Sequence, residues 1–492
     1  MHPIGALYDN LEQKAARPAL YDGDVTLTHG EVIDLVERAA RTLPAGARVG
    51  LCAANSWRHV VAYLAILRAG AVWAPLNPRN GARLNAELRE RANLALTLCD
   101  EGSRDVVGGF AGVTSLESWI DAAEEGAALP PLPGDPDSVF AIKFTGGSTG
   151  KPKGVVQSVR SAASAMASMQ GFYAFNERDV NLAVAPLTHG SSHYVIPVLA
   201  AGGAHVLMAQ PDRAQIVSEL KQRVSVAFMP PTLIHLLMND AAFGPSDFPA
   251  LRHITYSAAP MAPAAIDKAI ARFGPVISTV YGQTEAPMTV TALSSDAMRD
   301  PSLRASVGRA FEGVRVAVLT AAGEIQKRGE GEVIVSGDLA ATIYLDDPAQ
   351  TAASRHDGWL KTGDIGRIDD EGYLFLLGRC KEMIISGGYN IYPAEIERAL
   401  TAHPAVREVC AFGVNDEVWG ERLEAAVVAD GADEESLRAF VREALGPVRT
   451  PKRLHLLDAL PRNPVGKLVR GDIRDLCLRR DQKSRQEEEA VS

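Results

Sequence analysis

The feature that most constrains the fold of this chain is a regular alternation of two local patterns. Between residues 48 and 100, and again between 138 and 282, short apolar runs alternate with segments whose apolar residues recur at helical spacing. Strands that alternate with helices pair in parallel, and the helices then cover the faces of the sheet. The sequence therefore predicts an α/β fold with layers of parallel sheet.

The pattern changes in the last third of the chain. After Gly308 the sequence reads as hairpin-like strand pairs, which predict a small β-region. Beyond Arg379 we expect a smaller α+β unit with helices near Ala394–Thr401 and Glu434–Leu445. The final residues are charged and lack apolar periodicity, which indicates a disordered tail.

Length sets the number of domains. At 492 residues the chain is too long for one ordinary core. We predict a large N-terminal domain of several subdomains at residues 1–379, a small α+β C-terminal domain at 380–480, and the charged tail at 481–492.

Charge and cysteine usage exclude several classes of protein. The net charge of −10 argues against a partner that is a nucleic acid or an anionic membrane. The N-terminus carries Asp9 and Glu12 where a signal peptide would be apolar, and the longest apolar run stops at Arg68, short of a membrane span. We therefore expect a cytoplasmic protein. Its widely spaced cysteines indicate a reduced chain rather than a disulfide or zinc framework: Cys52, Cys99, Cys380, Cys410 and Cys477.

A glycine-rich stretch, FTGGSTGKPKG, continues the apolar run that ends at Phe144. Read as G-x-S-x-G, residues 146–150 fit the nucleophile elbow of a serine hydrolase, with Ser148 as the nucleophile. An elbow serine leads into a helix, however, and here Pro152 and Gly154 follow closely. The hydrolase is therefore the weaker alternative.

The same stretch does not fit a Walker A loop. That motif requires Gly where this chain has Thr145, and Ser or Thr where it has Pro152. Its four glycines, three hydroxyls and two lysines nevertheless suit a close backbone approach to a polyphosphate, with neutralisation of its charge. A phosphate-binding loop of another type is favoured over a plain surface turn.

Further motifs stand in order along the chain. They are APLTHG at Ala185–Gly190, YGQTE at Tyr281–Glu285, TGD at Thr362–Asp364 and NPVGK at Asn463–Lys467. With the glycine-rich stretch they resemble the adenylate-forming family of acyl-CoA synthetases, peptide-synthetase adenylation domains and luciferases, over nearly the whole chain. The resemblance implies an ATP-dependent carboxylic acid–CoA ligase. Such an enzyme forms an acyl-adenylate with release of pyrophosphate, and then an acyl-CoA thioester with release of AMP.

The resemblance also implies a role for each motif residue. The residues expected to bind the ATP phosphates are Thr145, Gly146, Gly147, Ser148, Thr149, Gly150, Lys151 and Lys153. Those expected to bind adenosine are Ser257, Ala258, Ala259, Tyr281, Gly282, Gln283, Asp364 and Arg379, although the family often has glycine at the position of Ser257. The catalytic residues would be His189, Thr284, Glu285 and Lys467, and Glu285 would also hold Mg²⁺.

The implied C-terminal domain is mobile. Lys381 matches the hinge about which the family rotates this domain, and Gly387 and Gly388 match the turn that lines the path of coenzyme A. Coenzyme A is therefore the expected thiol, and a separate acyl-carrier protein is the alternative. The oligomeric state is left open, with a homodimer as one option.

The segment around His189 indicates the class of acid. PLTHGSSHY, residues 186–194, contains no carboxylate that could pair with a substrate ammonium, and its surroundings are small or apolar. We therefore expect a fatty or aromatic acid. His189 and His193 stand four apart, a spacing that suits zinc on a helix, but the glycine and serines between them form helix poorly and HExxH is absent.

Overall fold

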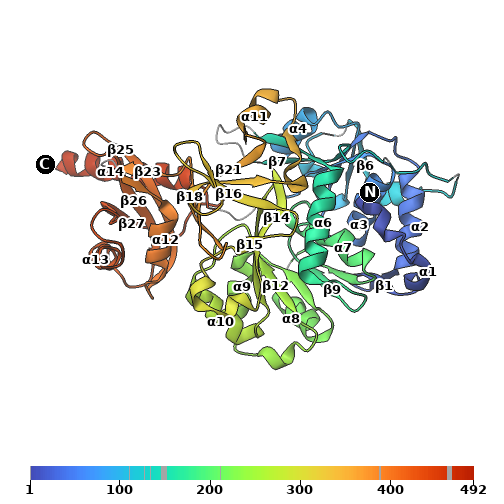
Figure 1. The fold of residues 1–492 in the computed structure, drawn as a ribbon, viewed down its shortest axis with the longest axis horizontal. Coiled ribbons are helices and arrows are strands. Elements are labelled where there is room, and N and C mark those ends of the chain that lie inside the picture. The colour runs from blue at the N-terminus through green and yellow to red at the C-terminus, as the bar shows by residue number, and fades with distance from the viewer. Residues whose placement is uncertain are drawn as a thin grey trace. The chain divides into compact units, whose positions relative to one another are not determined.

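The structure is a computed structural model, and its chain falls into two compact units. It describes residues 2–109, 111–126, 128–132, 134–145, 152–210, 212–386, 389–462 and 468–491. Unit 1 comprises Met1–Ala317, Ile334–Thr362 and Asp370–Leu374, and unit 2 comprises Val318–Val333, Gly363–Asp369 and Phe375–Ser492 (Figure 1). The predicted division into domains at residues 1–379 and 380–480 stays a prediction.

Unit 1 contains a nine-stranded sheet in the order β15-β14-β13-β12-β11-β9-β10-β1-β2. Its strands are β1 (Pro18–Asp22), β2 (Val25–Thr28), β9 (Val180–Ala183), β10 (Ala204–Leu207), β11 (Val226–Phe228), β12 (His253–Tyr256), β13 (Ile277–Gln283), β14 (Ala286–Leu293) and β15 (Arg309–Ala310). From β13 to β1 all neighbours pair in parallel, and β2, β14 and β15 pair antiparallel at the two edges.

A seven-stranded sheet in the order β19-β8-β7-β4-β3-β5-β6 is the second layer of unit 1. Its strands are β3 (Arg48–Cys52), β4 (Val72–Pro75), β5 (Leu96–Cys99), β6 (Val113–Ser115), β7 (Val139–Thr145), β8 (Lys153–Ser158) and β19 (Thr342–Tyr344). The strands from β7 to β6 pair in parallel, whereas β8 pairs antiparallel with both β7 and β19. The α/β fold with parallel-sheet layers is thus confirmed.

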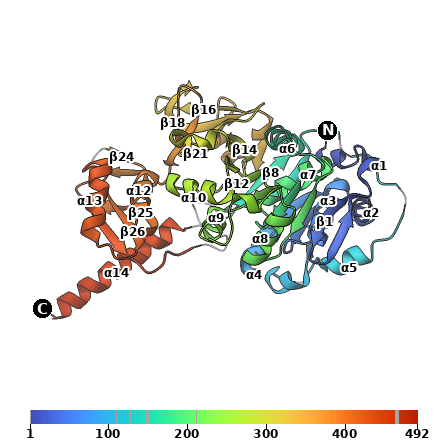
Figure 2. The same cartoon turned by 90° about the horizontal axis from the view of Figure 1, so that it is seen from below.

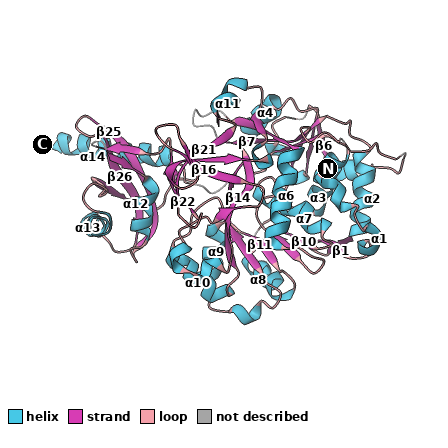
Figure 3. Cartoon of the chain, viewed as in Figure 1, coloured by secondary structure: helices cyan, strands magenta, loops and turns pink. Residues whose placement is uncertain are grey.

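Helices accompany these strands, as the alternating pattern predicts (Figure 3). They are α1 (Leu11–Lys14), α2 (His29–Ala40), α3 (Trp57–Arg68), α4 (Ala82–Arg91), α5 (Leu116–Asp121), α6 (Val159–Tyr173), α7 (Val195–Ala200), α8 (Arg213–Gln222), α9 (Pro231–Met238), α10 (Pro263–Phe273) and α11 (Pro348–Ala353). Local sequence sets where several begin: Ser56 and Ser158 cap α3 and α6 by accepting a hydrogen bond from a backbone N–H three residues on. From α3, apolar side chains such as Val60, Leu64 and Leu67 are fully buried in the core.

The predicted small β-region follows in the chain as a six-stranded sheet. Its path is β17-β16-β18-β21-β20, with β22 beside β21. The strands are β16 (Arg315–Leu319), β17 (Ile325–Gln326), β18 (Gly329–Ser336), β20 (Arg355–His356), β21 (Trp359–Ile368) and β22 (Leu374–Arg379).

Unit 2 ends in the expected α+β arrangement. Its sheet runs β24-β23-β26-β25 with β27 beside β26, and helices accompany it. The elements are β23 (Ile384–Ser386), β24 (Tyr389–Ile391), α12 (Pro393–Thr401), β25 (Val406–Asp416), β26 (Gly420–Ala429), α13 (Glu434–Leu445), β27 (Arg453–Leu456) and α14 (Arg470–Val491).

The charged tail lies in helix α14, and its predicted disorder stays a prediction. Helix α14 continues through residues 481–491, where the sequence indicated disorder (Figure 2). The reason is local: beyond Gly471 this segment contains neither glycine nor proline, and its Arg, Gln, Glu and Ala residues favour helix. Ile473 and Cys477 anchor the first turns by packing on the core that includes Phe412 of β25. Among the described residues, no helix is both long enough and apolar enough to cross a membrane.

Candidate active site

The YGQTE motif forms the turn between β13 and β14. The pairing of these strands is irregular between Tyr281 and Gln283, and Gly282 lies at this irregularity. A Cβ at Gly282 would lie 2.6 Å from the backbone of Met288, a distance that no side chain tolerates. The turn therefore requires glycine, and it places Glu285 just before β14 begins.

Side chains from strand β19 hold Glu285. The Tyr344 hydroxyl donates a hydrogen bond to Glu285 Oε1 at 2.8 Å, and Thr342 Oγ1 donates one to the backbone carbonyl of Glu285 at 2.7 Å. Burial and the nearby carboxylate raise the pKa of Tyr344 far above its usual value, so the hydroxyl remains a donor. The half-exposed carboxylate is therefore held in one orientation.

Lys153 lies near the ring of the same tyrosine. Its Nζ is 5.6 Å from the centroid of the Tyr344 ring and donates a hydrogen bond to Gln350 Oε1 at 2.9 Å. Lys153 begins β8, where it pairs with Thr145 at the end of β7. Strands β8 and β19 thus bring two predicted phosphate-binding residues and Glu285 into one region of unit 1.

The two predicted walls of the adenine site meet at one sheet edge. Ser257 follows β12, Tyr281 lies near the end of β13, and these strands pair in parallel. The carboxyl ends of parallel strands lie at the same edge, which is where α/β sheets bind ligands. Ala258 adopts φ +70°, a left-handed conformation in which a non-glycine residue is uncommon.

The loop that carries His189 is fixed by a residue from the other sheet. Asn55 is buried, and its Nδ2 donates hydrogen bonds to the carbonyls of Ala183 and Ala185 at 3.0 and 2.9 Å. Its Oδ1 accepts one from the backbone N–H of Leu187 at 2.9 Å. Asn55 follows strand β3 closely. The local sequence contains no pattern that would predict its role in holding this loop.

The two histidines lie in different surroundings. His189 is exposed, with Nδ1 2.9 Å from Thr188 Oγ1. His193 Nδ1 lies 3.1 Å from the Gly190 carbonyl, so Nδ1 carries the proton of the neutral ring. Burial, together with the charge of Lys143, lowers the pKa of His193 to about 3. Neither histidine belongs to a group of potential metal ligands in the part of the chain that is described.

Unit 2 contains the predicted ribose-binding pair. Asp364 is buried, and its Oδ1 lies 2.8 Å from Arg379 Nε in an ion pair whose arginine is largely exposed. Gly363, which adopts φ +72°, accepts a hydrogen bond from the Cys380 backbone N–H at 2.9 Å. This bond links the TGD turn to the segment after Arg379. The predicted hinge residue, Lys381, is exposed in the turn that follows.

Several predicted residues lie outside the described part of the chain. They are Gly146, Gly147, Ser148, Thr149, Gly150, Lys151, Gly387, Gly388 and Lys467. The segment after residue 151 nevertheless bears on the hydrolase alternative. It enters strand β8, whereas a nucleophile elbow would lead into a helix.

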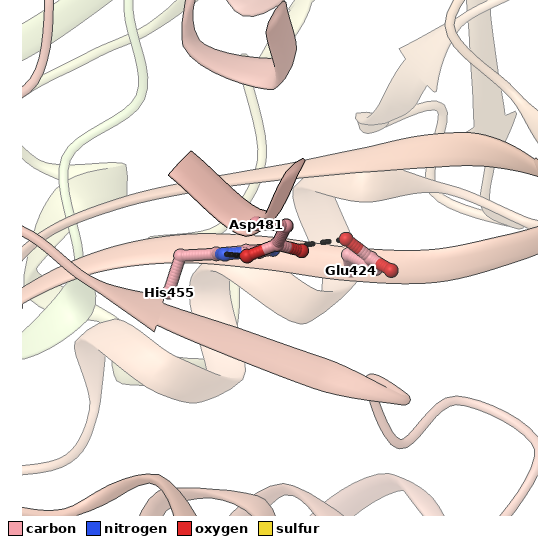
Figure 4. Close-up of side chains that lie close together, drawn as sticks. All are labelled: Glu424, His455 and Asp481. Carbon is pink, nitrogen blue, oxygen red and sulfur yellow. Dashed lines mark hydrogen bonds and ion pairs between the residues drawn. The ribbon is translucent and has the colours of Figure 1, made fainter. Parts of the chain in front are cut away.

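A buried charged cluster in unit 2 consists of Glu424, His455 and Asp481 (Figure 4). Their potential ligand atoms lie within 4.8 Å of one another. Glu424 Oε2 is 2.9 Å from His455 Nε2, and arginines balance both acids: Arg422 lies 2.5 Å from Glu424 and Arg453 2.7 Å from Asp481. Burial alone would raise the pKa of Glu424, but the hydrogen bonds from His455 and Arg422 hold it below its usual value. The cluster is a charge-balanced network that ties β26 and β27 to α14.

Comparison with known proteins gives one consistent result. The family model described as AMP-binding enzyme matches residues 7–345, and the AMP-binding enzyme C-terminal domain matches residues 395–467. Among curated relatives, the medium/long-chain-fatty-acid–CoA ligase FadD8 of Mycobacterium tuberculosis is 30% identical, covering 93% of this chain and 87% of its own. A feruloyl-CoA synthase of Amycolatopsis is 33% identical, covering 93% and 95%.

A solved structure agrees in fold. ATP-bound MatB from Rhodopseudomonas palustris superimposes with a TM-score of 0.88 at 28% identity, over 96% of this chain and 98% of the other. The amide bond synthetase McbA from Marinactinospora thermotolerans gives a TM-score of 0.86 at 28% identity, over 96% and 99%.

Proposed function

The chain belongs to the family of AMP-binding enzymes, and we propose that its acid substrate has a fatty or aromatic body. It is an AMP-forming acid–thiol ligase: relatives that match it over nearly their whole length are CoA ligases. Its substrates are a small carboxylic acid, ATP and a thiol acceptor. The observation that carries the acid class is the His189 loop: residues 186–194 contain no carboxylate that could pair with a substrate ammonium, and their surroundings are small or apolar.

The first half-reaction requires that a carboxylate attack a phosphate that is itself negative. Donors and cations directed at the developing charge lower this barrier. We assign Lys153, with the glycine-rich loop before it, to the β- and γ-phosphates, and Thr284 to the α-phosphate. Lys467 would bridge the acid and the α-phosphate. Asp364, with Arg379 beside it, would accept both ribose hydroxyls.

Glu285 is the proposed ligand for Mg²⁺. A carboxylate oxygen is the type of ligand that Mg²⁺ prefers, and the Tyr344 hydroxyl orients this carboxylate as an outer partner would. When bound, the ion would offset the negative charge of the phosphates.

Coenzyme A is the proposed acceptor because the named relatives are CoA ligases, and Gly387 and Gly388 are assigned to its path. A carrier protein is the alternative. A homodimer and a cytoplasmic location also stay predictions from the sequence.

A panel of carboxylic acids tests the proposal. The purified enzyme with ATP and Mg²⁺ should release pyrophosphate with fatty or aromatic acids and give the acyl-CoA, identified by mass spectrometry, when CoA is added. Faster turnover of an amino acid than of every fatty and aromatic acid would contradict the acid class. Acylation of a holo-carrier protein in place of CoA would instead establish the alternative acceptor.

A further inference from the structure

The loop that carries Thr284 and Glu285 is not of a type that its own residues stabilise. Strand β13 ends at Gln283, β14 begins at Ala286, and these two residues pair, so a two-residue hairpin loop lies between them. The favoured loops of this length need a positive φ at one or both loop residues. Both residues of this loop are described, and neither has a positive φ. We therefore expect contacts from outside the hairpin to hold its shape.

Two buried side chains of the seven-stranded sheet supply such contacts. Gln157 Nε2 donates a hydrogen bond to the Thr284 carbonyl at 2.8 Å, and Thr342 Oγ1 donates one to the Glu285 carbonyl at 2.7 Å. Gln157 is 2% exposed and Thr342 is 4% exposed. Both carbonyls belong to loop residues outside the β13–β14 ladder, so their hydrogen bonds come from the neighbouring sheet.

The two donors share one face of their sheet with other site residues. Gln157 of β8 and Thr342 of β19 are paired, so their side chains lie on the same face. Side chains alternate between the faces along a strand, which places Lys153 of β8 and Tyr344 of β19 on this face too. The hydrogen bond from Tyr344 to Glu285 agrees with this. One face of two strands therefore carries Lys153 and three donors to the loop.

The two carbonyl contacts fix something that Tyr344 does not. The Tyr344 hydroxyl orients only the carboxylate of Glu285. Gln157 and Thr342 hold the peptide units of the loop, and the orientation of those units sets the direction in which both loop side chains leave the backbone.

We propose that Gln157 and Thr342 are positioning residues for adenylation, which hold Thr284 toward the α-phosphate and Glu285 toward Mg²⁺. The inference rests on the proposed function, because that function assigns the two loop residues to these groups. Neither Gln157 nor Thr342 touches a reacting atom in this proposal. Each acts through the backbone of the loop residue to which it donates.

Substitutions at Thr342 test the Mg²⁺ side of the proposal. Thr342→Val removes the hydroxyl and nearly keeps the shape. The Mg²⁺ concentration for half-maximal pyrophosphate exchange should rise by roughly tenfold, as is typical when a metal ligand loses an outer partner. Thr342→Ser keeps the hydroxyl and should restore most of the wild-type Mg²⁺ dependence. Transfer from supplied acyl-adenylate to CoA should be retained in both variants, because pyrophosphate has already left and Glu285 is not assigned to that step.

A double-mutant cycle tests Gln157. Gln157→Leu removes the donor at similar volume and should slow pyrophosphate exchange by about tenfold or more, since a misplacement of about 1 Å can cost about 100-fold. In a Thr284→Val background the same substitution should cost little more, because both changes remove one contact with the α-phosphate. Gln170→Leu is the control. It breaks a similar bond, from Nε2 to the Phe175 carbonyl, at an exposed position of helix α6, and should leave the exchange rate unchanged.

The outcomes separate this inference from the proposed function. If Thr342→Val keeps the wild-type Mg²⁺ dependence and Gln157→Leu costs the same factor in both backgrounds, the positioning roles are wrong and the ligase assignment stands. If the wild type releases no pyrophosphate with any acid, the proposed function fails and the positioning roles fail with it. If Gln157→Leu does not fold, Thr342→Val and Thr342→Ser decide.

Discussion

At the scale of single residues, the proposed catalytic groups depend on partners that are distant in sequence. Tyr344 donates to Glu285 across 59 residues, and Asn55 holds Leu187 across 132. Neither Tyr344 nor Asn55 belongs to a recognisable motif in its own segment, so local sequence pattern does not predict that it contacts the site. The motifs supply the groups that would contact substrate, whereas the fold supplies what orients them.

Replacing Tyr344 by Phe tests this orientation. The change removes the hydrogen bond to Glu285 Oε1 and keeps the ring beside Lys153. Loss of such an outer partner typically weakens metal binding about 10–100-fold. We expect the Mg²⁺ concentration for half-maximal adenylation to rise by roughly tenfold. Tyr21→Phe, whose ring lies near Arg223, is the matched control. An unchanged Mg²⁺ dependence in Tyr344→Phe would contradict the proposed role of Glu285.

Lys143 also predicts a pH dependence of stability. Burial lowers the pKa of this lysine to about 7 in the folded protein, against 10.5 without burial. Between these two pH values the unfolded chain holds a proton on Lys143 that the folded protein has lost. The buried lysine therefore lowers the stability of the fold by its full amount below about pH 7, and this effect disappears as the pH approaches 10.5. Lys143→Met should raise the free energy of unfolding by a few kcal/mol near pH 7 and by less near pH 9.5. Denaturant unfolding at the two pH values measures this. A gain that is equal at both would show that Lys143 titrates normally.

At the scale of elements, the sequence predicts which segments form strands and helices, but it does not predict the order of strands in each sheet. Short apolar runs become strands and periodic segments become helices because both patterns are local. The order of strands within a sheet is not local, as the pairing of β1 with β10 shows. In helix α14 the two local signals differ, since residue preference favours helix where charge and the lack of apolar periodicity predict disorder. For the site, the motif residues stay predictions, and the sequence contains no signal for Asn55 and Tyr344, whose contacts arise only from packing.

The β13–β14 turn gives a prediction for one element. A side chain at Gly282 would collide with the Met288 backbone, so Gly282→Ala must displace the turn that carries Thr284 and Glu285. A misplacement of about 1 Å can cost about 100-fold in rate. We expect acid-dependent pyrophosphate exchange to fall by about that factor. Gly171→Ala, in helix α6 with open space around the added Cβ, is the control. Equal activity of the two variants would show that the turn accommodates the methyl group.

At the scale of the whole molecule, the proposed half-reactions involve different residues of unit 2. Lys467 is assigned to adenylation, and Gly388 to transfer of the acyl group to coenzyme A. One acyl centre can hardly receive both in a single arrangement, so we propose that the chain pivots at Lys381. A hinge residue must absorb a large change in backbone torsion.

Two substitutions should therefore damage opposite half-reactions. Lys381→Pro fixes φ near roughly −65° and removes the N–H, so pyrophosphate exchange should persist while transfer from preformed acyl-adenylate is lost. Lys467→Ala should lose adenylation and largely keep transfer from supplied adenylate. The two half-reactions are assayed separately on purified variants. Equal loss of both halves in both variants would mean that these residues support the fold.

The pairing of β1 with β10 has a consequence for how the protein is made. Asp22 leaves the ribosome long before Ala204, and at about 5–20 residues per second the delay is roughly ten to forty seconds. During this delay the edge of β1 that pairs with β10 has no partner in the β1–β2 hairpin. Most strands of the seven-stranded sheet have been synthesised before β10. Until β10 has been made, the nascent chain would expose the free edge of β1, and an unpaired edge is a template for pairing with other strands.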